Sequence, residues 1–131
     1  MSLDVSPELL AQAEVGPVAP EAFLDTVRTS LPYAYAMVER LAKELAAEPG
    51  APFADNVVPP ESEVERGQLL RALSSNAIRA SLEQHFGVAL AFQNCHRLAA
   101  FPAGAEESTV YLDFTSPRAQ VRNQSPELRD C

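Results

Sequence analysis

Four adjacent polar residues, Asn94-Cys95-His96-Arg97, are the part of this sequence best suited to chemistry. A cysteine thiolate is a nucleophile, and an imidazole exchanges protons near neutral pH. An arginine beside a cysteine lowers the pKa of the thiol. These residues stand within residues 88–101, an otherwise apolar run with the composition of a β-strand. The first question is therefore whether they form a site or are polar residues of a structural strand.

A second β-rich run, residues 108–116, follows the turn-forming sequence Pro-Ala-Gly-Ala-Glu-Glu. We expect the two runs to pair as an antiparallel hairpin, with apolar residues facing apolar residues and opposite charges facing each other. The register that does this joins three pairs: Leu98–Leu112, Ala100–Val110 and Arg97–Asp113.

Adjacent residues of a strand point to opposite faces, so Cys95 and His96 are not expected to form a nucleophile–base pair. On the face of Cys95, a small polar site competes with an Arg–Asp ion pair beside a buried cysteine. On the face of His96, a ligand pocket with Asn94 and either Tyr33 or His85 competes with a buried imidazole satisfied by its neighbours. The candidate ligand-binding residues are Asn94, Cys95, His96, Arg97, Tyr111 and Asp113.

Metal and cofactor motifs are not found. The two cysteines, Cys95 and Cys131, and the two histidines, His85 and His96, fit no standard zinc spacing. The sequence also has no nucleotide-binding loop and no Gly-x-Ser-x-Gly motif. We therefore expect no metal and no other cofactor, and the sequence leaves open whether the protein is an enzyme.

Helices are expected through the first two-thirds of the chain. Residues 7–14 predict a short helix within an N-terminal arm, residues 1–19. Pro20 opens the next helix, because a proline in the first turn needs no N–H group. Ser30 is the expected N-cap of a third helix, whose apolar residues recur every three or four positions. This helix should end at residues 48–50, Glu-Pro-Gly.

After a proline-rich loop at residues 49–61, residues 62–86 predict two helices rather than one. Ser62 and Glu65 form a capping box, which marks the beginning of the first. The leucines before residue 74 and the apolar residues after residue 77 lie on opposite sides of one helical wheel. A break at residues 74–76, Ser-Ser-Asn, resolves this conflict. Gly87 then ends the second helix.

These elements predict a single α+β domain spanning residues 1–131, with about four helices after the arm and then a C-terminal antiparallel β-hairpin. Residues 117–131 form a polar C-terminal tail. Two helices joined at "LSSN" and followed by a hairpin resemble the winged-helix superfamily over about residues 62–116, with "ALSSNAIRASL" resembling the turn and the start of a recognition helix. The resemblance implies that Asn76, Arg79 and Gln84 face the major groove of DNA, while Arg97 contacts a phosphate.

The charge is acidic and uneven. The net charge is −8, and residues 1–62 hold ten acids and three bases, whereas residues 66–101 hold four arginines and only Glu83 as an acid. The chain as a whole should be repelled by nucleic acid and by anionic membranes. The sequence shows no apolar run long enough to span a bilayer and no secretory signal, so we expect a cytoplasmic protein.

We therefore expect a small cytoplasmic, non-catalytic binding or regulatory module that is oligomeric or binds a protein partner. The odd-numbered face of the hairpin, rich in alanine and carrying Phe101 and Tyr111, could meet a second copy. Nucleic acid is a possible partner that the net charge disfavours. The alternative is a small enzyme or ligand-binding protein whose site lies around Asn94-Cys95-His96-Arg97.

Overall fold

The computed structural model describes residues 2–94 and 96–123, and every structural statement below refers to them. These residues form seven α-helices, one 3-10 helix and three strands. In chain order the elements are α1 (Pro7–Val15), α2 (Pro20–Ser30), α3 (Pro32–Ala47), β1 (Ala54–Asp55), α4 (Glu63–Leu73), α5 (Asn76–Phe86), β2 (Val88–Gln93), β3 (Arg97–Pro102), η1 (Ala105–Glu107), α6 (Thr109–Phe114) and α7 (Pro117–Arg122).

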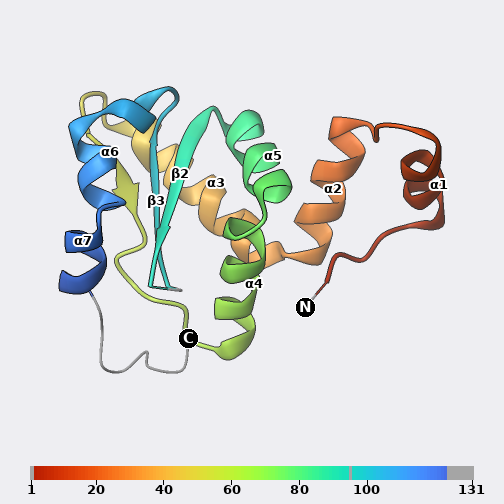
Figure 1. Cartoon of the computed structure of the whole chain (residues 1–131), viewed down its shortest axis with the longest axis horizontal. Coiled ribbons are helices and arrows are strands. Elements are labelled where there is room, and N and C mark those ends of the chain that lie inside the picture. The colour runs from red at the N-terminus through yellow and green to blue at the C-terminus, as the bar shows by residue number, and fades with distance from the viewer. Residues whose placement is uncertain (1, 95, 124–131) are drawn as a thin grey trace.

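The strands form one antiparallel sheet with β3 in the centre, in the order β1-β3-β2. β2 and β3 are a hairpin in which Leu90 lies opposite Ala100 and Phe92 lies opposite Leu98. Figure 1 shows α4 and α5 on one side of this hairpin and α6 and α7 on the other. The predicted α+β class, with helices first and a C-terminal antiparallel hairpin, is confirmed.

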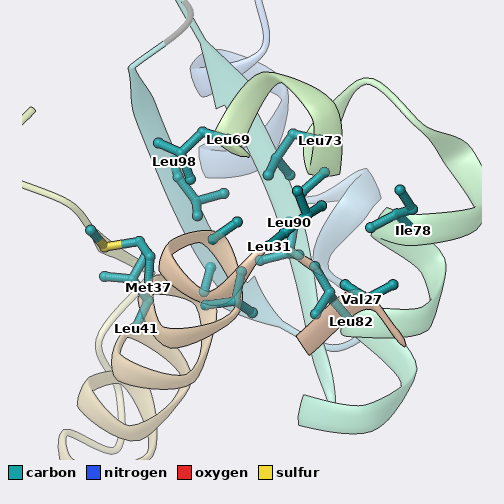
Figure 2. Packing of buried hydrophobic residues seen from close by; sticks show 14 of the residues in the cluster. Val27, Leu31, Met37, Leu41, Leu69, Leu73, Ile78, Leu82, Leu90 and Leu98 are labelled. Carbon is teal, nitrogen blue, oxygen red and sulfur yellow. The ribbon is translucent and has the colours of Figure 1, made fainter. Parts of the chain in front are cut away.

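The main core lies between the sheet and helices α2 to α5. Figure 2 shows Leu90 and Leu98 of the sheet among helical side chains such as Val27, Leu41 and Leu82. All five side chains are at most 1% exposed. Burying a leucine or valine side chain contributes about 1.5–3 kcal/mol each, so this layer dominates the stability of the domain.

A second, smaller core covers the opposite face of the sheet. Phe101 of β3 packs edge-on against Phe114 and Tyr111 of α6, with ring centroids 5.6 and 5.0 Å apart. The alanines of this face, Ala89, Ala91 and Ala99, are buried beneath the aromatic rings. The odd-numbered face that the sequence offered to a second copy is therefore covered within one chain.

The predicted break between two helices is confirmed. α4 begins after Ser62, whose Oγ accepts the N–H of Glu65, and it ends at Leu73. Ser75 caps α5 by accepting the N–H of Ile78. Gly87 ends α5 in the left-handed conformation, with φ of 66°, where glycine has no Cβ to strain.

The predicted hairpin strands and their register are wrong. Residues 88–101 are not one strand, because the chain turns back between Gln93 and Arg97 and β2 pairs with β3. Residues 108–116, expected as the second strand, contain α6 instead. Ser108 caps this helix by accepting the N–H of Tyr111. Helical spacing then brings Tyr111 and Phe114 onto Phe101, and this tertiary packing outweighs the β propensity of the segment.

Three smaller expectations also differ from the structure. The loop at residues 49–61 contains β1, which pairs with the free edge of β3. Residues 117–122, placed in the polar tail, form α7, while residues 124–131 lie outside the described part of the chain. Ser30 ends α2 rather than capping α3, and its Oγ accepts the N–H of Asp4. Among the described helices none is both long and apolar enough to cross a membrane.

A side chain from α4 caps α3. Gln68 is buried, and its Oε1 accepts the N–H groups of Tyr33 and Ala34 at 2.6 and 3.1 Å. These N–H groups belong to the first turn of a helix and have no partner within it. Gln68 therefore fixes the beginning of α3 against α4.

We predict that Gln68→Ala lowers the free energy of unfolding by about 1–3 kcal/mol, because it leaves buried N–H groups unpaired. Urea denaturation measures the change. The matched control is Gln84→Ala on the exposed face of α5, expected to change stability by less than about 0.5 kcal/mol. Equal losses in the two variants would contradict the capping role.

Candidate functional site

Asn94 and His96, two of the four adjacent polar residues of the sequence, lie in the turn between β2 and β3. Asn94 has φ of 53°, a left-handed conformation that asparagine tolerates better than most residues. The Nδ1 atom of His96 lies 2.5 Å from the carbonyl oxygen of Asn94. The backbone N–H of His96 donates to the carbonyl oxygen of Gln93 at 3.2 Å. Asn94 and His96 are therefore turn residues. The sequence had instead placed them on the core face of a strand. Cys95 and Cys131 lie outside the described residues.

The residue that follows β1 holds this turn in place. Asn56 is buried, and its side chain donates to the carbonyl of His96 at 2.6 Å. The same side chain accepts the N–H of Leu98 at 2.7 Å, and the backbone N–H of Asn56 donates to the Leu98 carbonyl at 3.1 Å. One asparagine therefore continues the pairing of β1 with β3 up to the turn.

Arg97 is a structural cation. Its Nε and one terminal nitrogen donate to Asp55 at 3.0 and 2.9 Å, and the other terminal nitrogen donates to Gln93 at 3.4 Å. The guanidinium carbon lies 5.0 Å from the ring centre of Phe114. The predicted Arg97–Asp113 pair is wrong, because Asp113 is exposed on α6, where it lines a hollow with Arg118 and Arg122.

The sequence predicted a pocket lined by His96 and either Tyr33 or His85. In the structure, Tyr33 and His85 have other neighbours. His85 is on α5, where its Nε2 lies 3.5 Å from the Tyr35 hydroxyl, and it lines a groove between α2 and α5. Tyr33 is on α3, where burial and then the nearby Glu65 raise the pKa of its hydroxyl. The ligand-binding role expected for Asn94 and His96 stays a prediction, which these contacts do not test.

A different set of residues gathers at the free edge of β2. Because the strand order is β1-β3-β2, one edge of β2 has no neighbouring strand among the described residues. Glu83 reaches this edge from α5, and its Oε2 accepts the N–H of Leu90 at 2.8 Å. Arg79 lies one turn earlier on α5 and donates to Asn76 at 3.0 Å.

Tyr111 of α6 packs on Phe101 of β3, which lies opposite Ala89 of β2 in the hairpin. Burial raises the pKa of the Tyr111 hydroxyl, the charge of Glu83 raises it further, and the charge of Arg79 lowers it. Both charges of α5 therefore lie within electrostatic range of this phenol. We call Arg79, Glu83, Tyr111 and the backbone of Leu90 the β2 edge cluster.

The β2 edge cluster draws on two sets of residues that the sequence kept apart. Arg79 and Asn76 came from the recognition-helix hypothesis, and Tyr111 came from the hairpin hypothesis. Gln84, the third residue of the first set, is exposed on α5 and lines the groove with α2. Sequence reasoning missed Glu83, although its position as the only acid within residues 66–101 was a usable signal.

The fold and this site define a small α+β module in which two short helices and a three-stranded antiparallel sheet carry a mixed-charge, aromatic edge. The whole chain, residues 1–131, matches the family model KH_NucS_shadow, whose description is "NucS shadow ORF", and the chain belongs to this family. The description states no biochemical activity. No curated protein and no solved structure matches the chain.

We predict that Arg97→Met lowers the free energy of unfolding by about 1–3 kcal/mol, since it leaves the half-buried carboxylate of Asp55 without its cation. The methionine still covers the ring of Phe114. Arg40→Met removes a comparable but exposed ion pair with Glu44 and should cost less than about 0.5 kcal/mol. Thermal or urea unfolding compares the two variants, and a smaller loss for Arg97→Met would refute the structural role.

Proposed function

We propose that this protein is a small non-catalytic module that binds single-stranded nucleic acid at the β2 edge cluster. The family name carries the term KH, and KH modules clamp single-stranded nucleotides. The observation that carries the proposal is the meeting of a cation, an aromatic ring and a free strand edge. Arg79, Tyr111 and β2 supply these three features from separate parts of the chain.

The two side chains have complementary roles in the proposal. Arginine contacts phosphate oxygens, which set the position of a nucleic acid without reading its sequence. The guanidinium of Arg79 has five N–H donors. Among the described residues it makes one hydrogen bond, to exposed Asn76, so the other donors can bind a phosphate. An aromatic ring such as Tyr111 supports an unstacked base, with about 1–3 kcal/mol for each stacked base.

The backbone of β2 adds hydrogen-bonding groups. In an antiparallel pair, alternate residues direct their N–H and C=O groups away from the partner strand. Leu90 is one of these, because Glu83 satisfies its N–H from outside the sheet. Phe92, two residues later, shares this direction and extends the edge toward the turn.

The charge around the β2 edge cluster is mixed, because Arg79 stands against Glu83 and the charge of Glu106 also reaches Tyr111. Residues 66–101 hold four arginines against Glu83 alone, within a chain of net charge −8. The chain has no Gly-x-x-Gly sequence, and the turn between α4 and α5 consists of Ser74 and Ser75. A close backbone clamp on several phosphates is therefore not part of the proposal. We expect weak binding that depends on one or two phosphate contacts.

The first test is fluorescence anisotropy of labelled DNA oligonucleotides over a range of salt concentrations. Each phosphate contact to a single strand contributes a slope of about −0.7 in log K against log salt. We predict that Arg79→Ala weakens binding about tenfold and makes the slope shallower by about 0.7. Arg40→Ala, an exposed arginine on α3, is the matched control and should leave both values unchanged.

A chain that binds no oligonucleotide would overturn the proposal. If its mass by light scattering also rises with concentration, the second candidate gains support, which is self-association. Two adjoining hollows of about 190 and 310 Å³ favour that candidate, because together they form a largely apolar groove between α2 and α5.

The second test separates stacking from packing at Tyr111. We predict that Tyr111→Phe keeps the affinity within about twofold, because the ring that stacks is retained. Tyr111→Leu should weaken binding by about 1–3 kcal/mol while still filling the space beside Phe101. Anisotropy gives the affinities, and circular dichroism checks the fold. Equal affinities for the two variants would remove Tyr111 from the site.

A further inference from the structure

α1 leaves most of its apolar side chains uncovered. Leu9 is its one buried residue, whereas Leu10 is 53% exposed and Val15 is 90% exposed. Figure 1 shows α1 beyond α2, at the end of the molecule remote from the sheet. Because burial of a leucine or valine side chain is favourable, this helix would gain stability from a second apolar surface.

The surface on which α1 lies is polar and poorly filled. A hollow of about 270 Å³ lies between α1 and α2, and the carboxylates of Asp4, Glu8 and Asp25 line it. Asp25 is paired with Arg28, but Asp4 and Glu8 form no ion pair among the described residues. An unfilled hollow contributes few contacts and like charges repel, so α1 itself is held chiefly by Leu9.

An apolar surface of matching length lies open on another side of α2. The groove between α2 and α5, whose two hollows measure about 190 and 310 Å³, has Val18 and Phe23 on one wall and Ala77 and Ala80 on the other. From Ala77 to Gln84 the α5 wall runs for about 10.5 Å, and the nine residues of α1 span about 13.5 Å. Alanine side chains allow the axis of another helix to come close. The groove therefore has the size and the composition to receive a short helix.

We infer that α1 of a second copy of this chain docks in the groove between α2 and α5, and that the two copies exchange this contact as a symmetric dimer. Leu10, Ala11 and Glu14 are spaced by one, three and four residues, so they form one outer face of α1 that meets the groove. A single helix of nine residues supplies less than the roughly 1,200–2,000 Å² that stable interfaces bury in total. A two-fold axis doubles the buried area, which is why the contact is reciprocal.

The polar groups of the two surfaces are also complementary. Ser81 and Gln84 line the groove, and their side chains form no hydrogen bond among the described residues. Their hydroxyl and amide groups donate hydrogen bonds, and the carboxylate of Glu14 on the incoming α1 accepts them. Glu21 is exposed at the rim of the groove, where water and salt screen its charge from that of Glu14.

This dimer is independent of the proposed nucleic acid binding. Arg79, Glu83 and Tyr111 do not line the groove, so docking of α1 does not use the β2 edge cluster. Salt separates the two events. Each copy carries a net charge of −8, so added salt screens the repulsion and tightens the dimer, whereas it weakens binding to a nucleic acid.

Sedimentation equilibrium of the full chain without nucleic acid gives the first test. We expect the mass to rise with protein concentration from 14.2 kDa to twice that value, and to rise at lower concentration when salt is added. Leu10→Lys should weaken the dimer about hundredfold, because each of the two symmetric contacts loses about tenfold in affinity. Leu112→Lys makes the same charge change at a leucine that is 56% exposed on α6, and it should leave the dimer intact.

A double-mutant cycle tests whether α1 meets the groove. Ala80→Glu places an acid in the groove at an exposed helical position, so the fold should persist, and circular dichroism checks it. Alone, this substitution should also weaken the dimer. When Leu10→Lys and Ala80→Glu are combined in one chain, the two introduced charges attract each other across the dimer, and we expect at least about tenfold recovery of affinity. Because α2 lies between α1 and α5 within one chain, such recovery reports a contact between copies.

A mass of 14.2 kDa at every concentration would overturn the inference and leave the groove to another partner. Equal losses for Leu10→Lys and Leu112→Lys, or purely additive effects in the double variant, would also overturn it, because the dimer would then use another surface. If no oligonucleotide binds while the mass rises as expected, the proposed function fails and the dimer stands.

Discussion

The central position of β3 is the constraint on which the rest of the structure depends. The strand is paired on both edges, by β1 and β2, and its four central residues, 98–101, are buried. Leu98 faces helices α2 to α5, while Phe101 faces α6. A six-residue strand enclosed in this way must be apolar on both faces, and it can place polar groups only at its ends. The polar residues Asn94, His96 and Arg97 accordingly gather at the turn before it.

The hydrogen bonds around that turn attach distant segments to the sheet. Asn56 joins β1 to β3, and Arg97 joins β3 to both Asp55 and α6. These contacts satisfy polar groups that an enclosed strand leaves at its end. The opposite edge of the sheet has a different character. There, Glu83 accepts the N–H of Leu90, and no strand pairs with the outer edge of β2 among the described residues.

The proposed function depends on the outer edge of β2, which has no neighbouring strand among the described residues. The helices of the main core hold Arg79 and Glu83 at the β2 edge, and the smaller core holds Tyr111 beside them. The acidic helix α2 packs against α5 (Figure 1), and the charge of Glu106 reaches Tyr111. The proposed binding of single strands therefore depends on a local balance of charge, and it calls for base recognition rather than strong attraction to phosphates.

The sequence by itself determined helices α1 to α5, the caps Ser62 and Gly87 and the break at Ser74–Ser75, because these depend on contacts within a few residues. It also assigned the residues of β2 and β3 to the correct faces, because the pairing sets even residues opposite even ones, as in Leu90–Ala100. Only the tertiary structure decided that residues 109–114 form a helix, because packing on Phe101 outweighs local β propensity. It alone also brought Arg79, Glu83 and Tyr111 together, since no local rule links residues so far apart in the chain.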